Sequence, residues 1–248
     1  MDRLDFLFRC IRQGLAQSGL VRRGLACLAL ALAASCLVPA LAQAAEGENV
    51  GHVSRVKGNV YVLHAGELLA AVPGVPVRRA DVLKTGPGAR VEVTMLDETR
   101  LTLGADTVLA VERYDLGRQS GQGAVGLLLT KGSFRVVTGQ LSALRGGPFE
   151  MLTPLATIGI ATSGPLGSPA AAGALGGTDV WGGFLAPEEL GVLHLAGPGA
   201  YVKNDGGRCD VARTFEGVRL TSPTAPPPEP TLWSPDRRAK ALRGVAFD

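Results

Sequence analysis

The stretch Val91-Glu-Val-Thr-Met95 decides the fold class, because apolar and polar side chains alternate along it. Arg100-Leu-Thr-Leu103 shows the same alternation after Asp97-Glu98. A period of two puts alternate side chains on opposite faces of a β-strand, so each segment can bury one face and expose the other. We therefore predict two neighbouring strands in a sheet with one buried face.

Short segments of the same kind continue along the chain, each closed by Gly, Pro, Asn or Asp. Residues 54–63 are expected to form a hairpin around Lys57-Gly58-Asn59, and residues 125–130 are expected to pair with residues 133–138 across Lys131-Gly132. Turns at intervals of about 8 to 12 residues are typical of sandwiches, barrels and solenoids. The prediction is an all-β fold, a short-strand β-solenoid-like or sandwich domain over residues 51–220.

The C-terminal part has a different composition. Residues 221–235 hold five prolines between Thr221 and Pro230, and we expect an extended linker that joins no central strand. Ser234 as N-cap and Pro235 at the first helical position predict a short helix within residues 236–248. Leu242, Val245 and Phe247 are expected to dock this helix on the body.

Residues 1–44 look like a secretory signal peptide. Arg22-Arg23 precedes an apolar run, residues 24–41, and Ala42-Gln-Ala44 is an A-x-A cleavage signature. Cleavage is expected between Ala44 and Ala45, with residues 45–50 as a mature N-terminal linker and a periplasmic or secreted location. Three alternatives stay open: an uncleaved inner-membrane anchor, a lipoprotein with its lipobox at Ala33-Ala-Ser-Cys36, and a translation start at Val21.

The distribution of charge argues against a nucleic-acid-binding protein, and the cysteine content argues against a fold held by disulfides. The formal net charge is +3, but residues 1–44 hold five Arg and two Asp, which leaves 20 basic and 20 acidic residues in the body. Without a basic block in the body, the sequence predicts no nucleic-acid partner. Of four cysteines only Cys209 lies outside residues 1–44, so no intramolecular disulfide is expected after cleavage.

The sequence predicts no enzyme, no cofactor site and no metal site. Gly121-Gln-Gly-Ala-Val-Gly126 matches G-x-G-x-x-G, but a strand is expected after it instead of the helix that a phosphate loop needs. His52, His64 and His194 are far apart and lack partners at zinc-like spacing. Carboxylates between Glu92 and Asp115 alternate with Arg, which favours a mixed-charge surface over a calcium site.

A series of segments carries a resemblance to a known family. In order they are Gly51-His-Val-Ser-Arg-Val-Lys-Gly-Asn-Val60, Leu83-Lys-Thr-Gly86, residues 89–97, Leu101-Thr-Leu-Gly104, residues 131–139 and Phe149-Glu-Met-Leu-Thr-Pro154. This series resembles the FecR domain, and Ala156-Thr-Ile-Gly-Ile160 and Gly177-Thr-Asp-Val-Trp-Gly-Gly183 continue it. The family-motif residues, whose role the resemblance leaves open, are Thr153, Pro154, Ala156, Thr157, Ile158, Gly159, Ile160, Gly177, Thr178, Asp179, Trp181 and Gly182.

The family motif is interrupted in this chain. Family members resemble A-T-I-G-I-R-G-T at this point, where residues 161–176 form an insertion rich in Gly, Ala, Pro and Ser. Such a segment has little to bury, so we expect a mobile loop whose flanking strands still pair. It is either a tolerated surface insertion or a lid specific to a partner.

The resemblance implies a function in the bacterial envelope. Relatives of the iron-citrate regulator type combine a cytoplasmic anti-sigma segment, one membrane span and a periplasmic β-domain. We expect an exported, non-catalytic FecR-like module that acts as a sensor or protein-interaction domain with an envelope protein partner. The alternative is a membrane-anchored FecR-type regulator of transmembrane signalling with an uncleaved N-terminal span. The oligomeric state is left open.

Overall fold

The computed structural model describes residues 47–117, 123–139, 149–161 and 177–247. These lie in one compact unit, Gly47–Asp248. The predicted signal peptide with its cleavage residues Ala42, Ala44 and Ala45, and most of the predicted insertion, lie outside the described residues.

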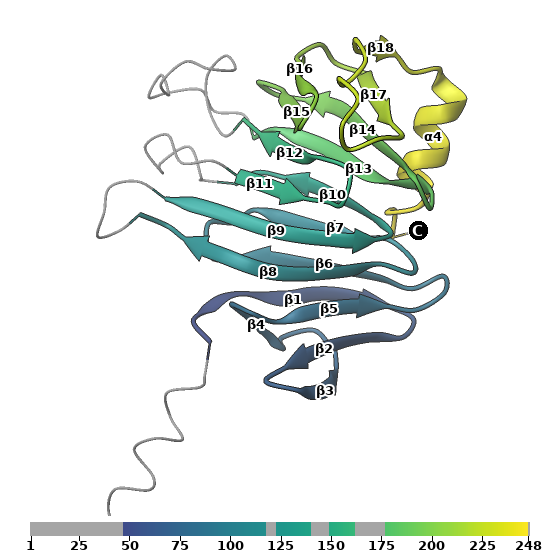
Figure 1. Cartoon of the computed structure of the whole chain (residues 1–248). Helices are drawn as coiled ribbons and strands as arrows, with labels where there is room; N and C mark the ends of the chain where they lie inside the picture. The colour runs from purple at the N-terminus through teal and green to yellow at the C-terminus, as the bar shows by residue number, and fades with distance from the viewer. Residues whose placement is uncertain (1–46, 118–122, 140–148, 162–176, 248) are drawn as a thin grey trace, which may run out of the picture. The chain divides into compact units, whose positions relative to one another are not determined.

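Two sheets form the body (Figure 1). Sheet A has the strand order β18-β17-β14-β13-β10-β7-β6-β1-β4, and sheet B has the order β16-β15-β12-β11-β9-β8-β5-β2-β3. The strands of sheet A are β1 (Asn49–Lys57), β4 (Pro76–Arg78), β6 (Arg90–Met95), β7 (Arg100–Leu103), β10 (Ser133–Val137), β13 (Asp179–Ala186), β14 (Glu189–Ala196), β17 (Glu216–Leu220) and β18 (Thr231–Leu232). Those of sheet B are β2 (Val60–His64), β3 (Glu67–Ala70), β5 (Val82–Thr85), β8 (Val108–Asp115), β9 (Ala124–Lys131), β11 (Phe149–Leu152), β12 (Thr157–Ile160), β15 (Ala200–Asn204) and β16 (Gly207–Val211).

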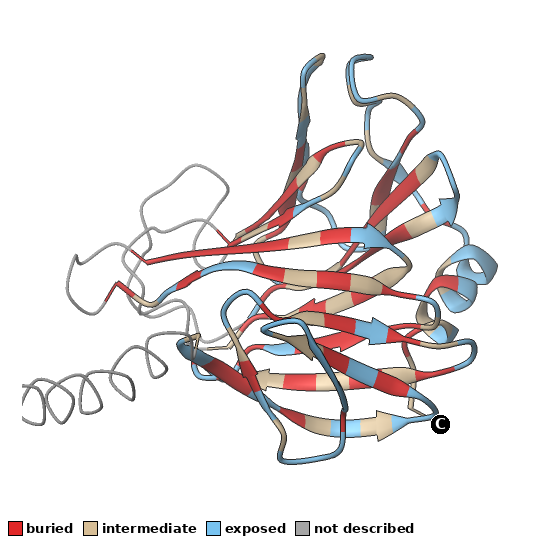
Figure 2. Ribbon diagram, turned by 60° about the horizontal axis from the view of Figure 1, so that its bottom comes forward, coloured by how far each residue is buried: buried red, intermediate tan, exposed pale blue. Residues whose placement is uncertain are grey.

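The core lies between the two sheets, because the apolar positions of each strand point to the same side. In β6, Val91, Val93 and Met95 are buried while the residues between them are partly exposed. Figure 2 shows this alternation of buried and exposed positions along the strands. Buried side chains from both sheets join one hydrophobic cluster. The all-β prediction is confirmed, as a sandwich of two open sheets.

One predicted strand pair is confirmed and two are wrong. β6 and β7 pair antiparallel across Asp97-Glu98, as the alternation predicted. The turns at Gly58 and Gly132 instead carry the chain from one sheet to the other, so β1 does not pair with β2, nor β9 with β10. Both glycines have positive φ, 76° and 90°, which allows a sharp reversal. A glycine turn predicts a reversal, but it does not say which sheet receives the next strand.

The C-terminal helix forms where the sequence predicts it. Helix α4 (Pro235–Arg243) begins after Ser234, whose hydroxyl accepts a hydrogen bond from the backbone N–H of Arg237 at 3.4 Å. Of the three residues expected to dock it, Val245 is buried and the other two are half-buried. No helix in the part of the chain that the structure describes is long and apolar enough to cross a membrane.

The Pro-rich segment before the helix is fastened to the β15–β16 turn. The side-chain amide of Asn204 donates to the backbone carbonyls of Ser222 at 3.2 Å and Ala225 at 2.7 Å. The backbone N–H of Asp205 donates to the carbonyl of Pro223 at 3.1 Å. The segment therefore runs along this turn as a strap before it reaches β18.

Candidate interaction surface

The first half of the family motif builds a turn and a buried strand. The Thr153 hydroxyl donates to the carbonyl of Ala156 at 2.7 Å and accepts from the N–H of Ala156 at 3.0 Å, which closes the turn around Pro154. β12 follows with Thr157 on its outer face, and Ile158 and Ile160 point into the core. These residues position β12 between β11 and β15.

Gly159 has a steric reason to be glycine. The ring of Tyr201 lies over it, and a Cβ built on Gly159 would be 1.9 Å from Cζ of that ring. The Tyr201 hydroxyl donates to the Glu150 carboxylate at 3.0 Å, and the Arg208 guanidinium lies 4.0 Å from the ring centroid. Burial, together with the bond to Glu150, raises the pKa of Tyr201 to about 12. The glycine thus seats an aromatic ring on the outer face of sheet B.

The second half of the motif starts the crossing to sheet A. Thr138 and Thr178 exchange hydrogen bonds, from the N–H of Thr138 to the Thr178 carbonyl at 2.9 Å and from the N–H of Thr178 to the Thr138 hydroxyl at 2.7 Å. The Thr178 hydroxyl donates to the carbonyl of Ala161, at the other end of the insertion. β12 belongs to sheet B and β13 to sheet A, so the expectation that they pair with each other is wrong. The insertion separates two strands at a change of sheet and does not divide a single strand.

β13 carries the remaining motif residues on its two faces. Asp179 accepts two hydrogen bonds from the guanidinium of Arg135, at 2.9 and 2.6 Å, and Arg135 has a raised pKa chiefly because of them. Trp181 meets Trp233 edge to face with ring centroids 5.9 Å apart. Gly182 faces the core, where a Cβ would be 2.6 Å from the Phe134 ring. Each of these contacts holds β13 in place where the chain crosses to sheet A.

The polar side chains that the sequence singled out do not converge on a reaction centre. His64 Nδ1 lies 2.5 Å from Asp81 Oδ1, whereas His194 is buried on β14 and His52 is exposed on β1. Asp97 accepts from the hydroxyls of Tyr114 at 2.9 Å and Thr99 at 2.5 Å, inside the protein. Among the described residues, no three His, Cys, Asp or Glu side chains could hold a metal ion.

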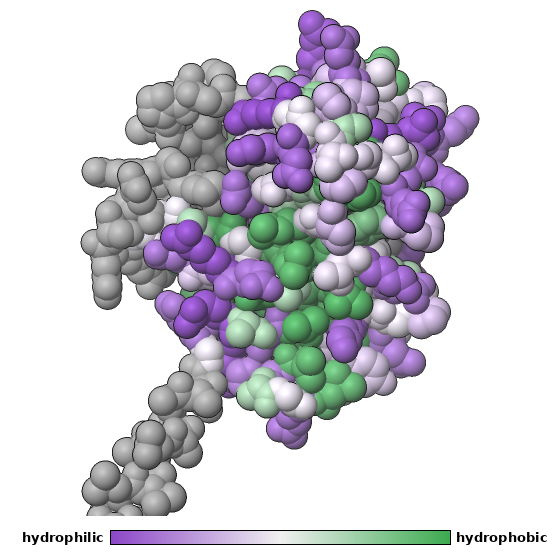
Figure 3. Space-filling view, in the orientation of Figure 1, coloured by the Kyte–Doolittle hydropathy of each residue, from purple (hydrophilic) through white to green (hydrophobic). Residues whose placement is uncertain are grey.

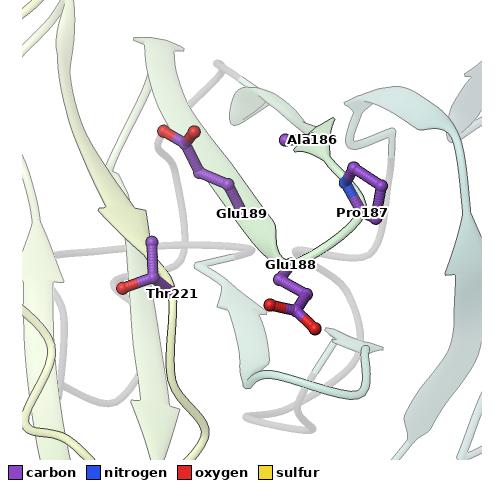
Figure 4. A pocket seen from close by; sticks show the side chains of 5 residues that line it. All are labelled: Ala186, Pro187, Glu188, Glu189 and Thr221. Atoms are coloured by element: carbon purple, nitrogen blue, oxygen red, sulfur yellow. The ribbon is translucent and has the colours of Figure 1, made fainter.

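Three further candidates for chemistry have simple structural explanations. Burial raises the pKa of the Cys209 thiol, which disfavours the reactive thiolate. A surface hollow of about 440 Å³ is lined by Ala186, Pro187, Glu188, Glu189 and Thr221 (Figure 4). Its Glu189 carboxylate is paired with Arg219 at 2.9 Å, and no basic nucleophile lines it. The glycines of the G-x-G-x-x-G match that are described lead into β9, a strand.

The outer face of sheet B instead carries a continuous row of aliphatic side chains. Cross-strand register places six of them opposite one another in sequence across the sheet: Leu68, Leu63, Val82, Ala110, Leu128 and Leu152. Leu68 is 54% exposed and Leu152 is 36% exposed, while the four between them are partly exposed. Strands about 4.8 Å apart give this row a length of about 24 Å. Figure 3 shows hydrophobic side chains gathered over this face.

The two outer faces of the sandwich differ in their covering. On sheet A, Trp181 and Leu193 are covered by Trp233, by Ala241 of α4 and by Val245 just after it. These five residues form a second small hydrophobic cluster. On sheet B, the aliphatic row has no such cover among the described residues. Individual exposed leucines are ordinary, whereas a contiguous exposed apolar patch is typical of an interaction surface. We call these six residues the apolar row.

Comparison with known proteins agrees with the family resemblance. Residues 81–164 match the sequence family described as FecR protein. The chain carries a FecR domain. The matched segment runs from Asp81, which directly precedes β5, to the start of the insertion, and so it is narrower than the 51–220 that the resemblance suggested. No curated protein sequence matches the chain.

Solved structures also resemble parts of the chain. Two crystal structures of a candidate anti-sigma factor from Parabacteroides distasonis ATCC 8503 are 17% identical, with a TM-score of 0.45. They cover 66% of this chain and 65% and 64% of that protein, so the chain spans less than two thirds of the relative's length. A cell surface anchoring domain is 24% identical, with a TM-score of 0.24, over 25% of this chain and 83% of that domain.

Proposed function

We propose that this FecR-like chain is an exported, non-catalytic module that acts as a sensor or protein-interaction domain in the bacterial envelope. The FecR match over residues 81–164 carries the proposal, because the family is regulatory and works through other proteins. Export rests on the signal-like residues 1–44 and the A-x-A site at Ala42 and Ala44. The boundaries that the sequence predicts for the signal peptide, the FecR-like domain, the Pro-rich linker and the C-terminal helix are part of this proposal.

The apolar row is the surface that the proposed partner covers. Its six aliphatic side chains are uninterrupted by charge, so it suits an apolar face of another envelope protein. Thr157, Lys203 and Arg208 continue the same register beyond Leu152 and give the row a polar end. A partner surface with apolar side chains in a line and an acidic group at this end would complement it.

The alternative proposal is a membrane-anchored regulator of transmembrane signalling. The apolar run of residues 24–41 is about as long as a spanning helix requires, which supports an uncleaved anchor. The two proposals differ in the fate of residues 1–44 and therefore in where the FecR domain is attached.

Intact mass and N-terminal sequencing of the protein from fractionated cells distinguish these proposals. We expect a chain that begins at or near Ala45 in the soluble envelope fraction. Retention of residues 1–44 in the membrane fraction would support the anchored regulator instead. Recovery from the cytoplasmic fraction would contradict both proposals.

A further inference from the structure

Six cations gather around the C-terminal helix, although the body as a whole is balanced in charge. They are Arg55, Arg90, Arg237, Arg238, Lys240 and Arg243, and we call them, together with Phe215 and Leu232, the α4 surface. The Arg90 guanidinium donates to the Arg243 carbonyl at 2.8 Å, and Arg55 lies 4.4 Å from the Phe247 ring, so strands β1 and β6 join the helix in one surface. We propose that the α4 surface binds the phosphate headgroups of an anionic phospholipid membrane.

The cations of this surface keep their charge unneutralised. Arg238 lies 4.0 Å from the Phe215 ring centroid and Arg237 lies 5.5 Å from that of Trp233. Arg90 donates to backbone carbonyls. None of the six forms an ion pair with a carboxylate of the described residues. Rings and carbonyls hold the guanidinium groups in place without cancelling the positive field.

Few acidic side chains oppose this charge. Asp236 in the first turn of α4 and Glu229 in the Pro-rich segment are the nearby carboxylates in sequence, and Glu216 is already paired with Arg213 at 3.6 Å. Glu92 stands opposite Arg55 across β1 and β6, where its carboxylate accepts from the Ser54 hydroxyl at 3.1 Å. Arg237, Lys240 and Arg243 follow one another at intervals of three residues and are all exposed. Figure 3 shows hydrophilic side chains gathered over the helix. The surface is therefore net positive.

Exposed apolar side chains beside these cations favour a membrane over an acidic protein. Leu232 on β18 is 73% exposed, the most exposed of the large hydrophobic residues described, and Phe215 beneath Arg238 is 39% exposed. α4 lies on the outside of sheet A (Figure 1). Basic groups with adjacent apolar side chains on an outward-facing helix are the pattern of interfacial binding. Five of the six cations are Arg, whose planar donor fork matches phosphate oxygens.

This membrane contact is separate from the one that the sequence predicted through residues 1–44. The two tryptophans of the chain, Trp181 and Trp233, both lie under the α4 surface, and residues 1–44 contain none. Tryptophan emission therefore reports on the α4 surface even in the full chain. Vesicles with a nitroxide quencher on the headgroup provide the probe.

The test compares quenching by phosphatidylglycerol vesicles with quenching by neutral phosphatidylcholine vesicles. We expect quenching by the anionic vesicles alone, and its loss in high salt. Arg237→Gln with Lys240→Gln should weaken binding about 30-fold, because two phosphate contacts are removed. The matched control, Lys84→Gln with Arg113→Gln, removes two exposed cations from sheet B and should leave binding unchanged. Circular dichroism confirms that each variant is folded.

Three results would overturn the proposal. The first is an absence of quenching by anionic vesicles. The second is an equal loss of binding in the α4 and control variants, since that would indicate general charge attraction. The third is a change of tryptophan emission with poly-glutamate but not with vesicles, which would assign the surface to an acidic polypeptide.

Discussion

At the scale of single residues, Gly159 tests whether the family motif serves packing. We predict that Gly159→Ala lowers the free energy of unfolding by about 1–3 kcal/mol, because the new methyl group must displace the Tyr201 ring. Gly126→Ala on the same outer face is the control, since its Cβ would lie 3.5 Å or more from its neighbours. Urea unfolding measures both. Equal losses in the two variants would contradict this account of the glycine.

Tyr201 also makes a prediction for alkaline pH. The pKa of its phenol is raised to about 12 in the folded state, above the value of about 10 in an unfolded chain. The unfolded form therefore loses its proton first, and stability falls as the pH rises from about 10 to about 12. Urea unfolding at about pH 9 and about pH 11.5 should show a smaller fall for Tyr201→Phe than for the parent. An unchanged fall would show that this phenol does not contribute.

At the scale of elements, the strap and helix at the C-terminus are held by Trp233. It is 1% exposed and packs on Trp181, whereas its neighbour Leu232 is 73% exposed. Trp233→Ala should reduce the free energy of unfolding by about 3–5 kcal/mol, and Leu232→Ala should change it by less than about 0.5 kcal/mol. Denaturant titration followed by far-UV circular dichroism checks both. Similar values for the two variants would show that the helical end contributes little.

The insertion gives a second prediction at this scale. Because the Thr178 hydroxyl bonds to the carbonyl of Ala161, the two ends of the insertion are already adjacent. Removal of residues 162–176 joins Ala161 to Gly177 and restores the spacing of the family motif. We predict a change of less than about 1 kcal/mol in the free energy of unfolding, since loop-closure entropy varies slowly with length. A loss of several kcal/mol would indicate that the segment packs on the body.

The sequence predicted local structure and the pairing of β6 with β7, but not the pairing of strands where the chain changes sheet. The alternation in β6 and β7 and the cap at Ser234 depend on neighbouring residues only, and both were predicted. The crossings at Gly58 and Gly132 depend on which sheet buries the next strand, and that follows from contacts far apart in sequence. Tyr201 over Gly159 could have been suspected only from a glycine inside a strand, which often marks a close approach.

At the scale of the whole molecule, the surfaces could not be predicted from composition. The body has equal numbers of acidic and basic residues, yet six cations meet around α4 because β1, β6 and the C-terminal helix come together. The apolar row likewise joins one residue from each of six strands through their register. Alternation indicates that such residues face outward, but only the order of the strands places them side by side.

Site-specific photo-crosslinking in living cells tests the central claim, that the FecR domain engages a protein partner through the apolar row. A photoreactive amino acid at Leu152 is compared with one at Leu185, a leucine of similar exposure on sheet A. We predict one discrete adduct from position 152, none from position 185, and loss of the adduct when Leu68 and Leu128 are changed to Asp. Adducts of equal yield from both positions, or an adduct that survives the change in the row, would contradict the account.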